Sequence, residues 1–577
     1  MSSIYDKSSL VLIPSGTKVS KVYSQKPVSG DGDFTFTRAS AATRVNADGN
    51  IEKETSNLVP RSNDFSAWSL ASNASVTGGQ AGYDGTNNAW LVTSSSTAQN
   101  YQIYRSWTTY GVLTFSIYAK ANTANIFLID FAIPDNGYVR VNLTDGSVVA
   151  ESGSSTFIAS NVQNVGNDWY RISVTANVTN SVYIRAGAYS TAGSVYIQDA
   201  QLEQGLVARD VITTTTSAVY GGITDNVPRL DYTDSSCPAL LLEPQRTNLI
   251  TASEYFDGGN LSNTTISAEY NTADTLSPEG VYNAAKLTAT GSFPRYFDYP
   301  TIADNVNVSL SVFAKEGDAS VFTIRGNDKS NTPFVVNFDL ANGTAELSQF
   351  DQLTPTFDIE PYGNGWYRCS LNTNSGSGGT AFQIRPISHA QGETGGWSGS
   401  NYIYAYGAQM EQDATYATSY IPTYGSSVTR SYDYLPIKYG MQNFLGTDTG
   451  TWFFHINDMF FDITGTGVGS FILTYTGTQL IELIQDGNDQ YKITLNNSVA
   501  VQDLDGEDKV AISWSSAGLV IYVNGSSVYT TTSTAYSNAY SSLTINKTTR
   551  PARVDLKQMM LFKTRLTNAE LATLTTI

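Results

Sequence analysis

The chain has 577 residues, of which 41% are hydrophobic and only 15% are charged, and its formal net charge is −18. A charged fraction so far below the usual quarter, with 36 tyrosines, favours strands and turns over surface helices. The acidic balance excludes broad binding to nucleic-acid phosphates and attraction to an anionic membrane, because both need a basic surface.

The cysteines and histidines limit the chemistry further. Cys237 and Cys369 fall in different predicted domains, so neither a disulfide framework nor a cysteine-rich zinc site is indicated. The two histidines, His389 and His455, form no HExxH motif. We see no signal peptide and no apolar run approaching about 18 residues. We therefore expect synthesis in a host cytoplasm without export, and no membrane insertion.

In chain order, residues 1–56 are predicted to form a strand-rich segment. Residues 57–206 are the first copy of a sequence that occurs twice in the chain. "LTFSIYAK" (113–120) returns as "VSLSVFAK" (308–315), "NDWYRISV" (167–174) as "NGWYRCSL" (364–371), and "IQDAQLEQG" (197–205) as "AYGAQMEQD" (405–413). The spacing between matched phrases grows along the chain, as expected when loops vary in length and strands are kept. Residues 248–425 are therefore predicted to be a second copy of one β-sandwich domain.

The rest of the chain supplies a connector and a third domain. Residues 207–247 connect the two copies and lack an apolar pattern for a core of their own, so we expect them to pair with the N-terminal segment. Residues 426–577 have a different strand pattern and are predicted to form a third β domain. Asp145-Gly146 and Asn524-Gly525 predict tight hairpins. A helix is indicated at "LTNAELATL" (566–574), where Thr567 and Glu570 form a capping box.

Several longer phrases carry a resemblance to known families. "IYDKSSLVLIPSG" (4–16) and "VPRLDYTDSSCPALLLEPQRTNLI" (227–250) are similar to a recurring class of bacteriophage virion proteins, described as tail-fibre-like or host-attachment proteins. The two copies resemble carbohydrate-binding-module jelly rolls. "VAISWSSAGLVIYVNGSSV" (510–528) resembles a laminin-G/concanavalin-like lectin sandwich. The fold class implied is all-β, with tandem jelly-roll β-sandwiches and a C-terminal concanavalin/laminin-G-like β-sandwich.

Tryptophans are the candidate ligand-binding residues, because a sugar ring can stack on an indole. Trp397 lies in a Gly/Ser-rich loop that the first copy lacks, which favours a contact with a ligand or partner. Trp68, Trp90 and Trp107 of the first copy are weaker candidates. The tryptophans of the repeated octets, Trp169 and Trp366, are interpreted as packing residues because a tryptophan buries a large apolar area.

Carboxylates suggest two further hypotheses. "DLDGED" (503–508) places Asp503, Asp505 and Asp508 around a glycine, as in calcium loops, although an acidic hairpin turn explains it as well. Ca²⁺ is therefore a possible cofactor. Glu203 and Glu411 recur in the two copies without a repeated acidic partner, whereas glycosidases need two carboxyl groups about 5–10 Å apart. We interpret both glutamates as structural caps and expect no enzymatic activity.

The resemblance implies a virion structural protein on the particle exterior. We expect a tail-fibre-like adhesin that binds bacterial surface polysaccharide, contacts other virion proteins and, by analogy alone, forms a homotrimer. The N-terminal segment is a possible point of virion attachment. The alternatives are a head fibre or capsid decoration protein with incidental glycan binding, and a polysaccharide-degrading tailspike. A tailspike would need an acidic pair and, usually, β-helix repeats, and the sequence has neither.

Overall fold

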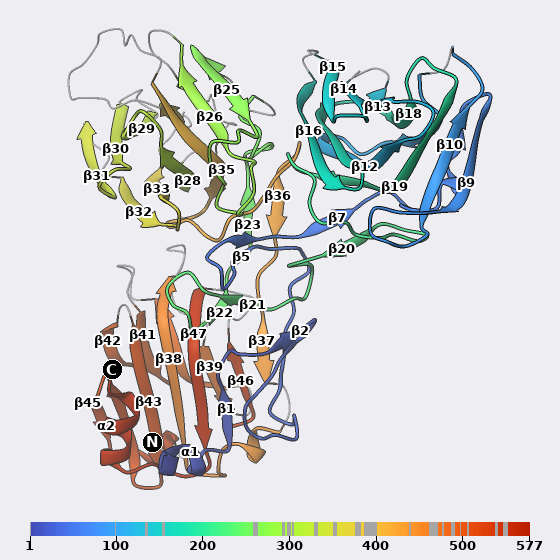
Figure 1. Ribbon diagram of the computed structural model, residues 1–577. Helices are drawn as coiled ribbons and strands as arrows, with labels where there is room; N and C mark the ends of the chain where they lie inside the picture. Colours follow the sequence, from blue (N-terminus) through green and yellow to red (C-terminus); the bar gives the residue numbers. More distant parts are fainter. Residues whose placement is uncertain are drawn as a thin grey trace.

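The structure of the protein is a computed structural model. It describes residues 2–97, 100–132, 137–152, 156–257, 263–290, 295–296, 302, 305–327, 333–349, 355–375, 382–385, 401–437, 440–460, 471–475, 478–485, 491–496, 498–504, 507–536, 540–545 and 552–577. The fold is all-β, as predicted, with two jelly rolls side by side and a third sandwich below them (Figure 1).

Jelly roll one (57–206) packs two antiparallel sheets face to face. Its strands are β8 (Ser69–Leu70), β9 (Ala74–Gln80), β10 (Ala89–Ser94), β11 (Ile103–Trp107), β12 (Gly111–Ala121), β13 (Ile126–Ala132), β14 (Gly137–Asn142), β15 (Ser147–Glu151), β16 (Phe157–Gly166), β17 (Trp169–Val178), β18 (Val182–Ala188) and β19 (Gly193–Gln204), with a short 3₁₀ turn η1 (Phe65–Ala67). The sheet orders are β16-β17-β12-β19-β10-β9 and β15-β14-β13-β18-β11-β8. Within them, β10-β19-β12-β17 faces β11-β18-β13-β14, which is the jelly-roll pattern of two Greek keys.

Jelly roll two (248–425) repeats this topology. Its strands are β24 (Asn263–Thr264), β25 (Ile266–Tyr270), β26 (Ala285–Ala289), β27 (Arg295–Tyr296), β28 (Asn307–Glu316), β29 (Val321–Asn327), β30 (Pro333–Asp339), β31 (Thr344–Gln349), β32 (Thr356–Pro361), β33 (Trp366–Asn374), β34 (Phe382–Arg385) and β35 (Tyr402–Gln412). The orders are β25-β26-β35-β28-β33-β32 and β24-β27-β34-β29-β30-β31. Alternate residues of each strand enter the core. In β33, for example, Cys369 and Leu371 are both fully buried.

The C-terminal sandwich also has two sheets. Its own strands are β37 (Leu435–Ile437), β38 (Gly450–Phe460), β39 (Phe471–Tyr475), β40 (Thr478–Gln485), β41 (Tyr491–Leu495), β42 (Ser498–Leu504), β43 (Asp508–Ser515), β44 (Gly518–Val523), β45 (Ser526–Thr531), β46 (Ser542–Ile545) and β47 (Arg553–Phe562), with 3₁₀ turns η2 (Met441–Asn443) and η3 (Thr534–Tyr536). One sheet runs β37-β46-β39-β40-β41-β42 and the other contains β47-β38-β43-β44-β45.

The second of these sheets takes strands from far outside residues 426–577. Strand β1 (Leu10–Leu12) pairs with β47, with Leu10 opposite Leu561. Strand β22 (Ala239–Leu242) pairs with the same strand, with Leu240 opposite Leu556, and β21 (Arg229–Asp231) extends the sheet beyond it. The N-terminal segment and the C-terminal sandwich therefore share one sheet and do not form opposite ends of the molecule.

Short strand pairs connect the jelly rolls to this sandwich. They are β7 (Thr55–Asn57) with β20 (Val219–Gly221), and β23 (Arg246–Asn248) with β36 (Val428–Arg430). Within the N-terminal segment, β5 (Arg44–Val45) pairs with β6 (Ile51–Glu52), and β2 (Thr17–Lys18), β3 (Lys21–Val22) and β4 (Phe34–Thr35) form a three-stranded sheet. The pair of β7 and β20 joins the N-terminal segment to the connector. Each jelly roll is thus an insertion between two strands of a small antiparallel pair (Figure 1).

The C-terminal helix and one of the two predicted tight hairpins are confirmed. Helix α2 (Asn568–Thr575) begins with the predicted capping box of Thr567 and Glu570. Asn524 and Gly525 form a two-residue hairpin turn with φ of 48° and 84°, as predicted. The turn at Asp145-Gly146 instead spans four residues between β14 and β15, and it is Gly146 that has positive φ. Helix α1 (Ser2–Lys7) was not predicted.

The two jelly rolls also touch directly. The backbone N–H of Val112 donates to the carbonyl of Tyr424 at 2.7 Å, and a Cβ on Gly111 would overlap that same carbonyl. Glycine is therefore needed where β12 begins. Among the residues that the structure describes, no helix is both long and apolar enough to span a membrane.

Candidate functional site

The polar residues that recur in both copies form the same internal clamp. In jelly roll one, the side-chain amide of Asn57 donates to the carbonyls of Ala200 at 3.0 Å and Ile212 at 2.8 Å, and its oxygen accepts from the N–H of Leu202 at 3.2 Å. Jelly roll two repeats these bonds with Asn248, Ala408, Ile421 and Met410. In each jelly roll, the clamp holds the segment that follows the last strand against the segment that enters the domain.

The repeated glutamates belong to this clamp. Glu203 accepts from the N–H of Arg209 at 3.1 Å and from the side chain of Gln201 at 2.8 Å. Burial raises the pKa of Glu203, and the Gln201 hydrogen bond opposes that effect. Glu411 accepts from the N–H of Thr418 at 2.9 Å in the second copy. Both side chains act as caps, as expected, and neither faces solvent.

The tryptophans of the repeated octets are buried, as predicted, but on the outer face of their sheets. Trp169 packs with Tyr118 and Ala89, and Trp366 with Phe313 and Tyr404. Both are at most 2% exposed. Neither offers a ring face to a ligand.

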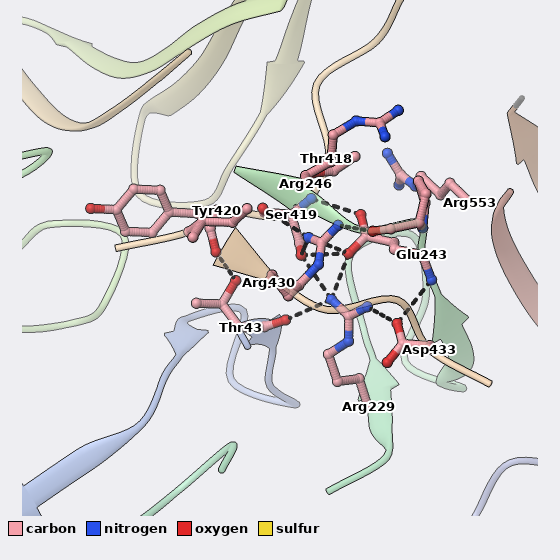
Figure 2. Close-up of polar contacts among 12 residues, drawn as sticks. Thr43, Arg229, Glu243, Arg246, Thr418, Ser419, Tyr420, Arg430, Asp433 and Arg553 are labelled. Atoms are coloured by element: carbon pink, nitrogen blue, oxygen red, sulfur yellow. Dashed lines mark hydrogen bonds and ion pairs between the residues drawn. The ribbon is translucent and has the colours of Figure 1, made fainter. Parts of the chain in front are cut away.

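A cluster of fully buried charges joins the domains (Figure 2). Arg229 contacts Glu243 at 2.6 Å and also pairs with Asp433, while Arg430 contacts Glu243 at 2.8 Å. Burial alone would raise the pKa of Glu243, but Arg430 and Arg229 outweigh it and hold that pKa far below its usual range. All four side chains have no solvent-exposed area. The cluster is a structural junction and not a binding site.

A second buried group joins the N-terminal segment and the connector to jelly roll two. The Lys53 ammonium contacts the Glu254 carboxylate at 2.6 Å and also pairs with Glu279, which in turn pairs with Arg209. Burial would raise the pKa of Glu279, but Arg209 and Lys53 lower it to about 2. A cavity of about 170 Å³ lies beside this group, and Arg209 and Glu203 in its wall are already paired.

The outer face of one sheet of jelly roll one is partly exposed, unlike these buried groups: Tyr183 on it is exposed, whereas Asp130 is buried. On the sheet β15-β14-β13-β18-β11-β8, outward positions carry aromatic and charged side chains. The pairing register places Tyr104 opposite Arg185, Arg185 opposite Asp130, and Asp130 opposite Tyr138. This row crosses four strands, about 14 Å. We call the surface the tyrosine platform; it consists of Tyr101, Tyr104, Asp130, Tyr138, Arg140, Tyr183, Arg185 and Tyr189.

Tyrosine rings form one side of the platform. Tyr104 contacts Tyr101 and Tyr183 edge to face, with ring centroids 5.8 Å and 5.7 Å away. Tyr183 is 42% exposed. A tyrosine presents an apolar ring face together with a polar hydroxyl, so it can pack on a sugar ring and also bond its hydroxyl groups.

An ion pair makes the centre of the platform rigid. Arg185 donates from Nε to Oδ1 of Asp130 at 2.8 Å and forms a second bond to Oδ2, and its guanidinium lies 4.4 Å from the ring centroid of Tyr101. Burial raises the pKa of Asp130, and Arg185 opposes that shift. The bidentate geometry holds both side chains in one orientation. The platform is therefore largely preformed.

Jelly roll two lacks this arrangement. Where jelly roll one pairs Asp130 with Tyr138, jelly roll two pairs Arg325 with Val335. Where jelly roll one pairs Leu128 with Arg140, jelly roll two pairs Thr323 with Asn337. Val335 is fully buried and Asn337 nearly so. The platform is thus a property of the first copy, although the two folds match.

The structure describes three of the predicted tryptophans, Trp68, Trp90 and Trp107, and none of them belongs to the platform. Trp68 is 4% exposed; its ring packs against Phe65, with centroids 5.4 Å apart, and under the guanidinium of Arg105. Trp90 and Trp107 are partly buried against the core. Trp397 lies outside the described residues. Ligand binding by Trp90, Trp107 and Trp397 stays a prediction, and little of Trp68 is open to a ligand.

The calcium hypothesis is also untested. Asp508 is buried at the start of β43 and accepts from the side chain of Asn524 at 2.8 Å. Asp505 and the side chain of Asp503 lie outside the described part. Within the described residues, no group of three His, Cys, Asp or Glu side chains is placed to hold a metal ion.

Comparisons with known proteins add little to this geometry. No protein-family model matches the chain, and no curated protein matches it. One solved structure that it resembles is the N-terminal tandem of two CBM22 domains, CBM22-1 and CBM22-2, from Paenibacillus barcinonensis Xyn10C. That match has 12% sequence identity and a TM-score of 0.19, and covers 62% of this chain and 96% of the other.

Proposed function

We propose that this protein is a non-enzymatic, glycan-binding adhesin on the exterior of a bacteriophage particle, with the tyrosine platform as its glycan-binding surface. The observation that carries the proposal is the row of outward tyrosines, Tyr104 and Tyr183 among them, beside the fixed Arg185–Asp130 pair. Aromatic rings with a few oriented polar groups are the usual makeup of a ligand site. Phrase-level similarity to tail-fibre-like virion proteins supports the location.

Weak individual sites would suffice on such a particle. A virion that displays many copies converts modest affinities into firm attachment through effective concentration. A homotrimer is the assembly we propose, by analogy with tail fibres, and other virion proteins are the proposed partners. Bacterial surface polysaccharide is the proposed ligand.

The first test measures binding of the full chain to a panel of neutral and acidic bacterial polysaccharides. We expect a Tyr104→Ala/Tyr183→Ala double variant to weaken binding about tenfold or more, as for other central aromatic contacts. Tyr220→Ala is the matched control, because Tyr220 is 54% exposed outside the platform. Absence of binding to every polysaccharide, or equal affinities of the two variants, would contradict the proposal.

The second test locates the protein on the virion. Gold-labelled antibody against the C-terminal sandwich should mark the tail tip or the baseplate periphery. Label spread over the head would instead indicate a capsid decoration protein and would overturn the adhesin role.

A further inference from the structure

Arg140 is the one charged group of the platform without a counter-charge bound to it. Its guanidinium contacts two tyrosine rings, 4.6 Å from the centroid of Tyr138 and 3.9 Å from that of Tyr189. Across the described residues, no hydrogen bond or ion pair of Arg140 is found, and its buried Nε has no partner. Arg185, by contrast, is paired with the carboxylate of Asp130.

The surroundings leave this cation available. The carboxylate on the same face, Asp130, is bound bidentately by Arg185, although the Arg140 charge also favours its ionised form. The chain as a whole has a formal charge of −18, so a partly exposed guanidinium without a bound carboxylate is a local exception. Contact with two rings restrains the guanidinium, and its terminal nitrogens, unlike the buried Nε, are left to bind a planar, two-oxygen anion.

We propose, resting on the proposed function of the platform, that its ligand is an acidic polysaccharide with carboxylate-bearing sugars, and that Arg140 binds the carboxylate. Tyr104 and Tyr183 then pack on neighbouring sugars. Arg140 is therefore the residue that selects an acidic glycan over a neutral one. At the equivalent position jelly roll two has Asn337, which accepts from Thr323 at 2.7 Å, so that module lacks the selecting cation.

The test uses the full chain and three uronate polysaccharides, polygalacturonate, alginate and hyaluronate, each beside its carboxyl-reduced form. Affinity is measured by calorimetry for the parent protein, Arg140→Gln and Arg140→Lys. Lys120→Gln is the charge-matched control, because Lys120 lies on the opposite sheet and donates to the carbonyl of Asn167. Thermal melting checks that each variant is folded.

We expect at least one acidic polymer to bind about tenfold or more tightly than its reduced form. Arg140→Gln should remove that preference, Arg140→Lys should keep part of it, and Lys120→Gln should leave it unchanged. Equal binding to acidic and reduced forms, or the same preference in Arg140→Gln, would overturn the inference while the proposed glycan binding stands. Failure to bind any uronate polymer would also overturn it, and failure on the neutral panel as well would overturn the proposed function.

Discussion

Gly146 closes the turn between β14 and β15 with φ of 77°, and Gly343 closes the equivalent turn of jelly roll two with φ of 65°. A Cβ on Gly146 would overlap the ring of Tyr170, and one on Gly343 would lie 3.0 Å from the ring of Tyr367. These are the tyrosines of the repeated Trp-Tyr-Arg triplets. Glycine and tyrosine therefore form one packing unit, which gives a physical reason for the recurrence of both.

We expect Gly146→Ala to destabilise jelly roll one by about 2–5 kcal/mol, from left-handed strain together with displacement of Tyr170. Gly85→Ala is the control, because Gly85 has φ of 79° with nothing within 4 Å of the added Cβ. The free energy of unfolding of Gly85→Ala should fall only by the cost of left-handed strain, about 1–2 kcal/mol. Urea unfolding measures both, and equal losses would show that the contact with Tyr170 contributes nothing.

At the scale of elements, local structure was predictable and the binding surface was not. The Asn524-Gly525 hairpin and the Thr567 capping box are formed by residues close in sequence, so the sequence alone contains all that is needed to predict them. The tyrosine platform had only a partial signal, the alternation in "YVRVN" (138–142) and "VYIRA" (182–186). Alternation shows which side chains share one strand face. It does not show which strands are neighbours, so the platform tyrosines could not be grouped from the sequence, and the rarer tryptophans were the predicted ligand contacts.

The buried junction had no sequence signal at all. Arg229, Glu243 and Asp433 become neighbours only because β21, β22 and the chain after β36 meet beside the C-terminal sandwich (Figure 2). Arg229 and Glu243 are 14 residues apart, on one strand and at the end of its partner, but Asp433 lies 190 residues beyond Glu243, and no spacing rule links it to them. Conversely, the clamp of Asn57 and Asn248 could be predicted as structural once the repeat was recognised, because it recurs while the loops differ.

We expect Glu243→Gln to destabilise the protein by about 3–5 kcal/mol, because it leaves the buried guanidinium groups of Arg229 and Arg430 without one of their carboxylates. Glu52→Gln is the control, since the Arg44–Glu52 pair is partly exposed, at 22% and 32%. A pair of that kind contributes less than about 1 kcal/mol. Calorimetric melting of both variants checks the contrast, and similar shifts would contradict a structural role for the junction.

At the scale of the whole molecule, the chain returns repeatedly to one sandwich. Strands β1, β22 and β47 share a sheet, while the jelly rolls are inserted beside it (Figure 1). The platform strands β13, β14 and β18 lie on the side of jelly roll one away from β7, which joins that domain to the rest. A ligand can therefore reach the platform without moving the other domains.

The contact that holds jelly roll two to the N-terminal segment and the connector should depend on pH. The folded-state pKa of Glu279 is about 2 against an ordinary value of 4.5, so the unfolded chain binds more protons between these values. The stabilisation is fully present above pH 4.5 and is lost as pH falls towards about 2. Glu243 shifts in the same direction. We expect the free energy of unfolding to fall in this window.

The control for that prediction is the variant Glu279→Gln. Its neutral amide cannot bind the proton that the Glu279 carboxylate takes up on unfolding in acid. Its free energy of unfolding should be lower at neutral pH and should depend less steeply on pH below 4.5. Small-angle scattering over the same range should show the molecule expanding at a higher pH in the variant, because jelly roll two is held less firmly to the N-terminal segment and the connector. An unchanged pH slope would mean that Glu279 does not couple protonation to the domain contact.

The measurement that tests the central claim most directly is hydroxyl-radical footprinting of the intact protein with and without saturating polysaccharide, beginning with polygalacturonate. If the platform is the glycan-binding surface, oxidation of Tyr104 and Tyr183 falls on binding. Tyr220 and Tyr282, which are 54% and 50% exposed elsewhere on the molecule, are then oxidised as before. Protection of these control tyrosines with no change at Tyr104 and Tyr183 would contradict the account and place the glycan on another domain.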